Sequence, residues 1–417
     1  MAVPCIAFLL PLSVFSPSLA SNGTEATATS IVSSAASVPP ACLVRLAARD
    51  ESDRTLFESV AAATATPGLA VAPLHPLERG GVQWRSLAIL KDDAGSGAPP
   101  HWSVTTVATI DRERDQVLLQ VPGLPACAGR RDSALVQTAS PAPAGRFDSG
   151  SASASTSAFA PGSAVLLARG RDGFRNRLIG GRVERVVGLP GDRRMLLVRL
   201  LDERGADPGL LFDPAGSLLG SVLPSPAGGD LSLATVVLQP GGPTSAAPAG
   251  AAPANVRDAI TVAPSPSVLG TVPGLVSQAL RLSGSARFDR ALALLDEVFR
   301  QAGVTASLLL EKGVLEFGAG RVASAVEDFR QAAGIDPASH LARYNLGIAL
   351  GTEGRYQDAA AALQSARDLD PTHGRTRFQL ALALRAMGKT EEARRELESL
   401  GSIDPVLAGE LKVILGA

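Results

Sequence analysis

Histidine, cysteine and serine are the residue types in this chain that could bind a metal ion or act in nucleophilic catalysis, and their spacing limits both chemistries. No cysteine pair lies beside any of the four histidines, which are His75, His101, His340 and His373. Scattered ligands of this kind predict no metal site. The chain has no G-x-S-x-G motif, and Gly228-Gly229 lacks the Lys-Ser/Thr of a phosphate-binding loop. We therefore expect neither a metal ion nor a small-molecule cofactor.

The three cysteines allow at most one disulfide. Cys5 lies in the N-terminal apolar segment, which leaves Cys42 and Cys127. These two could form a disulfide in an oxidising compartment, although their distance in the sequence does not decide whether they meet.

The N-terminal residues are typical of a secretory signal peptide. An apolar run from Ile6 to Phe15 is followed by small residues at Ser18 and Ala20, the positions that a signal peptidase recognises. The sequence therefore predicts a signal peptide over residues 1–20 and a protein that is periplasmic or secreted.

Length, charge and composition outline the rest of the chain. A chain of 417 residues can hold two or three domains, and a net charge of −1 without a basic tract does not favour a nucleic-acid-binding surface. Residues 21–40 are rich in Ser, Thr and Ala and predict a disordered spacer. Residues 239–268 are a Pro/Ala/Gly linker between one domain at 41–238 and a second at 269–417.

Residues 41–238 have the pattern of an all-β domain. Short β-like segments alternate with turn residues, and no long amphipathic helix separates them. The segments are 68–71, 83–90, 104–110, 117–121, 164–168, 181–187, 195–200 and 217–222. This pattern predicts a β-barrel or a β-sandwich.

Four segments of this domain resemble the trypsin-like serine proteases, in particular their HtrA/Deg-type branch. They are residues 111–121, 161–168, 180–186 and 205–220, and their order and spacing agree with that family. The resemblance implies an all-β double barrel. It also implies a site built from a serine nucleophile, a histidine base and an aspartate that orients the histidine.

On this resemblance the catalytic positions are only partly retained. His75 lies near the position of the base, and Asp115 fits the orienting aspartate. The nucleophile position holds Asp207, followed by Pro208. A histidine cannot activate a carboxylate as it activates a hydroxyl, and proline lacks the N–H that a tight oxyanion loop uses. The resemblance therefore implies a degenerate protease domain that does not catalyse hydrolysis.

Two alternatives remain open for this domain. It could be an active serine endopeptidase whose nucleophile lies elsewhere, as at Ser149 in Asp148-Ser149-Gly150, although only 33 residues separate Asp115 from Ser149. It could also be a β-sandwich unrelated to the proteases.

The last third of the chain repeats at an interval of 34 residues. Three series of identical residues repeat at this interval: the prolines at 337, 371 and 405, the glycines at 320, 354 and 388, and the alanines at 291, 325, 359 and 393. The pattern resembles the tetratricopeptide (TPR) family, whose unit is a pair of antiparallel helices. It predicts an all-α TPR solenoid with units at 272–305, 306–339, 340–373 and 374–407, and a capping helix at 405–415. Lys312 and Glu316 depart from the family by occupying positions of large apolar residues.

A TPR array implies the binding of a protein or peptide partner in a groove lined by the first helix of each unit. The residues that we expect in the groove are Leu310, Val314, Leu341, Tyr344, Asn345, Ile348, Arg375, Phe378, Gln379 and Leu382. If Tyr344 and Arg375 are exposed there, they suit an extended or helical peptide that carries an acidic group. The whole sequence thus predicts an exported protein-interaction scaffold.

Overall fold

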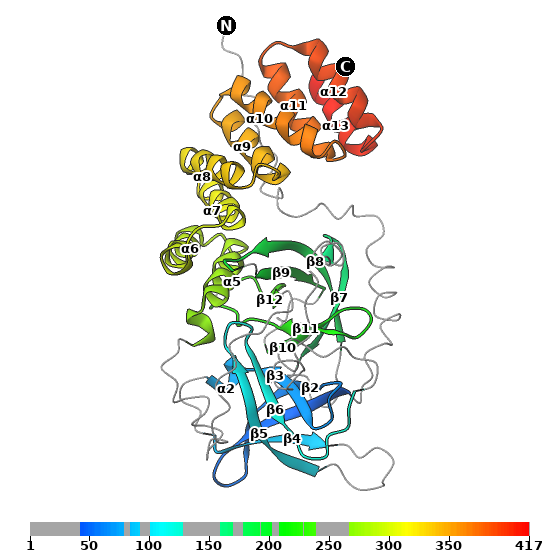
Figure 1. Cartoon of the computed structure of the whole chain (residues 1–417). Coiled ribbons are helices and arrows are strands. Elements are labelled where there is room, and N and C mark those ends of the chain that lie inside the picture. Colours follow the sequence, from blue (N-terminus) through cyan, green and yellow to red (C-terminus); the bar gives the residue numbers. More distant parts are fainter. Residues whose placement is uncertain are drawn as a thin grey trace, which may run out of the picture. The chain divides into compact units, whose positions relative to one another are not determined.

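The computed structural model describes residues 42–78, 84–91, 101–127, 159–169, 178–191, 193–201, 208–227, 229–238 and 267–416 (Figure 1). The chain forms two compact units, of which one ends at Ser285 and the other begins at Ala286. The strands belong to the first unit, and helices α6 to α13 belong to the second.

Six antiparallel strands of the first unit close into a barrel. They are β1 (Leu43–Arg49), β2 (Thr55–Ala63), β3 (Leu69–Pro73), β4 (Ser86–Lys91), β5 (His101–Asp111) and β6 (Gln116–Gln120). Their order is β1-β2-β3-β6-β5-β4, and β4 closes the barrel by pairing with β1. Leu46, Ile89 and Leu119 are fully buried, as the alternation of side chains along a strand allows.

The next six strands form a second sheet with a related topology. They are β7 (Ala164–Arg169), β8 (Leu178–Gly188), β9 (Arg194–Leu200), β10 (Gly209–Phe212), β11 (Leu218–Ser221) and β12 (Leu233–Leu238). Their order is β11-β10-β7-β8-β9-β12, which is the cyclic order of the first barrel opened between the fifth and sixth strands. A bridge between Val222 and Val236 joins the two edges at that opening.

An apolar cluster joins the two sheets. Leu43 and Val60 of the barrel are buried in it against Leu210 and Phe212 of the second sheet. Each fully buried side chain of this size contributes about 1.5–3 kcal/mol to folding, so the two sheets stabilise one another.

Helix α5 (Val272–Ser283) packs against the second sheet, although the repeat spacing assigns these residues to the first TPR unit. Arg281 of α5 is fully buried and donates a hydrogen bond of 3.0 Å to the carbonyl oxygen of Leu223. The hydroxyls of Ser277 and Thr235 are 2.6 Å apart, which ties α5 to β12. The spacing of small and apolar residues does not predict that α5 packs against the sheet, because this packing depends on the buried polar side chains of Arg281 and Ser277.

The second unit is a succession of antiparallel helices. They are α6 (Phe288–Ala302), α7 (Ala306–Gly318), α8 (Val322–Ile335), α9 (His340–Thr352), α10 (Tyr356–Leu369), α11 (Gly374–Ala386), α12 (Thr390–Gly401) and α13 (Pro405–Leu415). Among the described residues, no helix is long and apolar enough to cross a membrane.

Small residues set the distance between paired helices. A Cβ atom at Gly313 would lie 2.6 Å from the ring of Phe329, and one at Gly347 would lie 2.5 Å from Leu363. Gly354 adopts a φ of 78° between α9 and α10, a conformation that side chains with a Cβ rarely adopt. The 34-residue pattern therefore reflects close packing within each pair and a left-handed turn between its helices.

A disulfide joins Cys42 to Cys127 in the first unit. Cys42 precedes β1, and Cys127 lies after β6, where its N–H donates to the carbonyl oxygen of Thr64. The structure thus pairs the two cysteines whose meeting the sequence left open.

Because this disulfide closes a loop with a sequence separation of 85 residues, Cys127→Ser should lower the free energy of unfolding by about 2–4 kcal/mol. Urea denaturation of the oxidised protein measures the change. Dithiothreitol should produce the same loss in the wild type and none in Cys127→Ser. Equal unfolding midpoints for the variant and the oxidised wild type would contradict the prediction.

Candidate functional site

The structure brings together two of the predicted catalytic residues, His75 and Asp115. His75 begins the short helix α2 (His75–Glu78) directly after β3, and Asp115 ends the turn between β5 and β6. Nδ1 of His75 lies 2.5 Å from Oδ2 of Asp115. The other oxygen, Oδ1, accepts hydrogen bonds from the backbone N–H groups of His75 at 2.6 Å and Leu74 at 3.1 Å.

Both side chains are held away from solvent. Asp115 is fully buried and His75 is 6% exposed. Asp115 also has a φ of 56°, which is uncommon for a residue other than glycine and is typical of functional or tightly constrained sites. The three contacts to Asp115 fix the imidazole with Nδ1 on the carboxylate, the orientation that a general base requires.

Further charged pairs connect α2 with the turn that carries Asp115. The guanidinium of Arg112 donates to the carboxylate of Glu78 at 2.8 Å, and that carboxylate also accepts from the N–H of Val268 at 3.1 Å. Arg114 and Asp111 form a second, buried pair. Burial raises the pKa of Asp111 despite the opposing charge of Arg114, and burial lowers the pKa of Arg114.

The third member of the predicted site is its nucleophile. Asp207 and Ser149 both lie outside the described residues. Pro208 is described and buried, and it directly precedes β10. The structure therefore describes the histidine and the aspartate of the predicted site. Of the nucleophile loop it describes Pro208, the residue after the predicted nucleophile position.

The predicted groove residues of the helical unit are more buried than expected. Five of them are buried, namely Tyr344, Asn345, Ile348, Phe378 and Gln379. Leu310, Val314, Arg375 and Leu382 are half-buried, and Leu341 is exposed. The condition that Tyr344 is exposed is not met, because only 4% of the residue is accessible and its ring packs against that of His373. Substituting it with alanine would disturb the fold as well as any ligand contact.

The structure also identifies two histidines that the sequence analysis did not connect. His340 begins α9 and His373 precedes α11, and their ring centroids are 4.5 Å apart. The ring of Tyr344 lies 5.1 Å from that of His373. The interval of 33 residues between the two histidines, one short of the repeat, was the signal that could have placed them at equivalent helix starts.

Ion pairs explain the polar residues at two apolar positions of the repeat. Lys312 lies 3.5 Å from Asp296 of α6 and 4.0 Å from Asp328 of α8. Glu316 pairs with Arg321 at 3.3 Å. Burial raises the pKa of Asp328 to about 6, with Lys312 opposing the shift. Charge pairing thus replaces apolar packing around α7.

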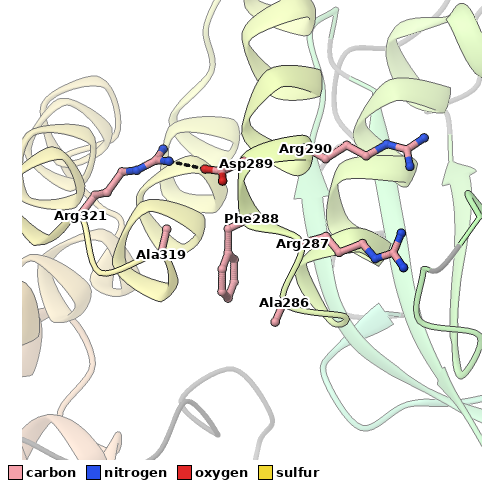
Figure 2. A pocket seen from close by; sticks show the side chains of 7 residues that line it. All are labelled: Ala286, Arg287, Phe288, Asp289, Arg290, Ala319 and Arg321. Atoms are coloured by element: carbon pink, nitrogen blue, oxygen red, sulfur yellow. Dashed lines mark hydrogen bonds and ion pairs between the residues drawn. The ribbon is translucent and has the colours of Figure 1, made fainter.

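A hollow of about 440 Å³ lies at the start of α6 (Figure 2). Arg321 reaches across it to form an ion pair with Asp289, and Phe288 lies on the same side as Ala319. Asp289 neutralises Arg321, and Phe288 packs against Gly318. The hollow is therefore part of the contact between α6 and α7.

Comparison with known families identifies the repeats. Residues 276–340 and 352–408 match family models of the tetratricopeptide repeat. The C-terminal part of the chain is therefore a TPR array, a class of helical scaffold that binds proteins. No match was found among curated proteins.

Several solved structures are similar to about a third of this chain. One is YrrB, described as a TPR protein with an unusual peptide-binding site, at 15% identity over 37% of this chain and 78% of that one, with a TM-score of 0.32. MamA of Desulfovibrio magneticus RS-1 is 18% identical over 33% of this chain and 77% of its own, with a TM-score of 0.32. A thermophilic TPR protein of Thermus thermophilus is 17% identical over 35% of this chain and 84% of its own, with a TM-score of 0.31.

Because Asp115 is buried and accepts three hydrogen bonds, Asp115→Asn should lower the free energy of unfolding by about 1–3 kcal/mol. The matched control is Asp53→Asn. Asp53 also has a positive φ, but its side chain is 74% exposed, so this change should have little effect. Chemical denaturation compares the two variants. Equal stability of Asp115→Asn and the wild type would show that the pair does not hold α2.

Asp328 predicts a pH-dependent stability of the TPR array. Its folded-state pKa of about 6 exceeds the ordinary 3.8, so stability is lost as the pH rises from about 4 to above 6. Asp328→Asn should therefore raise the free energy of unfolding at pH 7 by about 1–2 kcal/mol, with the gain disappearing near pH 4. Asp296→Asn is the control, because that carboxylate is 58% exposed. A less stable Asp328→Asn variant at pH 7 would contradict the expectation.

Proposed function

We propose that the protein is an exported scaffold. In it, the TPR array binds a peptide of a partner protein, and the strand-rich unit is a trypsin-like domain without a catalytic nucleophile. The observation that carries the proposal is the buried His75–Asp115 pair. This pair is the arrangement that trypsin-like catalysis needs, yet the corresponding nucleophile position holds Asp207 in the sequence.

The strand topology supports a trypsin-like origin. The resemblance implies two barrels, and the two six-stranded sheets share one cyclic strand order. His75 follows the third strand of the first sheet, and Asp115 precedes its sixth. Position 207 precedes β10, the fourth strand of the second sheet, as the resemblance to the family's nucleophile loop requires.

The chemistry of residues 207 and 208 supports the loss of catalysis. In the family, the histidine takes a proton from a serine hydroxyl and so creates the nucleophile. An aspartate at that position is already ionised at neutral pH, so a base has no proton to remove. Pro208 adds no N–H group to a loop that would have to stabilise an oxyanion.

A structural role explains why the pair is present without a nucleophile. A fully buried carboxylate is costly unless its oxygens accept hydrogen bonds, and Asp115 accepts them from two backbone N–H groups and the imidazole. Removing His75 would leave Oδ2 of Asp115 without this donor. The same contacts that once oriented a base would therefore hold α2 to the barrel.

The disulfide supports export. Disulfides persist in secreted and periplasmic proteins and are rare where thiols are kept reduced, and the N-terminal residues have the pattern of a signal peptide. A scaffold outside the cytoplasm is consistent with both features.

The well-formed His75–Asp115 pair also favours a second candidate, an active serine endopeptidase with its nucleophile at another position such as Ser149. In that protein the TPR array would recruit a substrate or partner. The two candidates differ in one measurable property, the presence of a serine that reacts with an acylating or phosphonylating probe.

We expect the purified protein not to react with a fluorophosphonate probe and not to hydrolyse casein above the level of a buffer control, because no serine occupies the nucleophile position. Asp207→Ser alone should remain inactive, since Pro208 is retained, and Asp207→Ser combined with Pro208→Gly tests whether these two residues account for the loss. Probe labelling of the wild type that disappears in His75→Gln would establish the endopeptidase instead. Loss of labelling in Ser149→Ala would then identify its nucleophile.

A further inference from the structure

Three aromatic rings gather where the third and fourth predicted repeats meet. The ring centroids of His340 and His373 are 4.5 Å apart, and those of Tyr344 and His373 are 5.1 Å apart. His340 and Tyr344 stack within α9, with centroids 6.2 Å apart. The two imidazoles are half-buried, whereas Tyr344 is only 4% exposed.

Thr376 fixes one side of each imidazole. Its hydroxyl oxygen is fully buried with the residue and lies 2.7 Å from Nδ1 of His373 and 3.5 Å from Nε2 of His340. This contact leaves the opposite ring nitrogens, Nε2 of His373 and Nδ1 of His340. Neither of these atoms has a hydrogen-bond partner among the described residues.

Two further donors at this cluster lack an acceptor. The hydroxyl of Tyr344 makes no hydrogen bond to any described residue, although the residue is almost fully buried. Arg375, whose charge acts on both Tyr344 and His373, forms no ion pair within the described part of the chain. These polar atoms are open to solvent and make no contact that the fold depends on, so they are available to a ligand that supplies acceptors.

The fixed positive charge of Arg375 is the feature of the cluster that favours an anion. Burial lowers the pKa of His340, and burial together with the neighbouring His340 and Arg375 lowers the pKa of His373 to about 4. Asp370 opposes both shifts, but its carboxylate already accepts hydrogen bonds from the N–H and hydroxyl of Thr372 at 3.0 and 2.7 Å. Burial raises the pKa of Tyr344 to about 12, with Arg375 opposing, so its hydroxyl remains a donor at neutral pH. His340 and His373 also lie at helix N-termini, where the helix dipole favours negative charge.

We propose that His340, Tyr344, His373 and Arg375 form a binding site for an oxyanion carried by the partner peptide, either a carboxylate or a phosphate, and that the imidazoles take up a proton when it binds. This inference rests on the proposed role of the TPR array in binding a peptide. The guanidinium of Arg375 supplies the fixed charge, and the hydroxyl of Tyr344 supplies a neutral donor. The two imidazoles become additional charged donors once the anion is present, because a nearby negative charge favours their protonated form.

Proton uptake gives the site a defined pH dependence. Without an anion, burial holds the pKa of both imidazoles below its usual value, and a bound anion would raise it. For His373 this proton uptake falls in the range from about pH 6 to 4, so binding should tighten as the pH falls through this range, provided that the anion itself stays ionised. A site formed by arginine alone would show no such dependence in this range.

Nuclear magnetic resonance of the histidine side chains tests this inference in the full-length protein, which has only four histidines. Histidine labelled with ¹³C at Cε1 would be followed from about pH 3 to 8, with His340→Gln and His373→Gln assigning two of the signals. The probes are acetate for a carboxylate and inorganic phosphate for a phosphate, each compared with chloride at the same ionic strength. We expect the titration midpoints of His340 and His373 to rise by about one pH unit with at least one probe, while those of His75 and His101 do not change.

Arg375→Gln provides the decisive variant, with Arg385→Gln as its control. Both arginines are half-buried on α11, but Arg385 lies in the last turn of the helix, far from the rings. Arg375→Gln should abolish most of the anion-dependent rise, and Arg385→Gln should preserve it. Tyr344→Phe removes only the hydroxyl, so it should reduce the rise while keeping the packing of the ring.

Midpoints of His340 and His373 that do not respond to either probe would overturn the inference, as would a response that survives Arg375→Gln. A response to phosphate alone would indicate a phosphorylated peptide, and a response to acetate alone a carboxylate. This titration reports on α9 and α11, whereas fluorophosphonate labelling reports on the strand-rich unit. Failure of the oxyanion site is therefore distinguishable from failure of the degenerate-protease proposal.

Discussion

The buried carboxylate of Asp115 is the constraint on which the arrangement of the strand-rich unit depends. A charge removed from water must be compensated by hydrogen bonds or by an opposite charge, or the fold loses several kcal/mol. Asp115 obtains this compensation from residues 74 and 75, which are about forty positions earlier in the sequence, so α2 must lie against the β5–β6 turn. The ion pair of Glu78 with Arg112 connects the same two elements and extends the contact to the N–H of Val268. Two carboxylates, those of Asp115 and Glu78, thereby connect three distant segments of the chain.

Buried charge recurs as a way of joining elements in both units. Arg281 attaches α5 to the loop after β11, although its helix otherwise has the apolar residues of a repeat unit. Lys312 connects carboxylates of α6 and α8 where other TPR units have apolar packing. Removing Lys312 would be costly, because the largely buried carboxylate of Asp328 would lose its nearby cation. The main effect of these contacts is therefore to determine which elements pack together. Their net contribution to the stability of the fold is smaller.

Catalytic geometry and structural geometry overlap in the His75–Asp115 pair. An aspartate that orients an imidazole also satisfies its own buried oxygens, so the pair stabilises the fold whether or not a nucleophile is present. The cluster of His340, Tyr344 and His373 is different, because several of its donors have no partner among the described residues. These donors are open to solvent, so an anion could bind them without breaking a contact of the fold, as we propose. Of the two histidine sites, the one in the TPR array is thus better suited to ligand binding in this protein.

The sequence by itself determined the features that depend on local conformation and short spacing. Gly354 and Gly388 mark left-handed turns between helices. Gly313 and Gly347 mark close contacts between paired helices. Both kinds of position favour glycine because it has no Cβ atom. The 34-residue interval therefore predicted the helical array, and alternating residues predicted the β-rich domain. Tertiary structure alone decided which residues from distant segments meet, because sequence separation carries little information about contact in space. It closed the first barrel and paired Cys42 with Cys127. It brought together His75 and Asp115, which the resemblance to the trypsin-like proteases had assigned to one site. It also buried Tyr344 between helices and placed His340 beside His373, since the packing of α9 against α10 and α11 determines which side chains face inward.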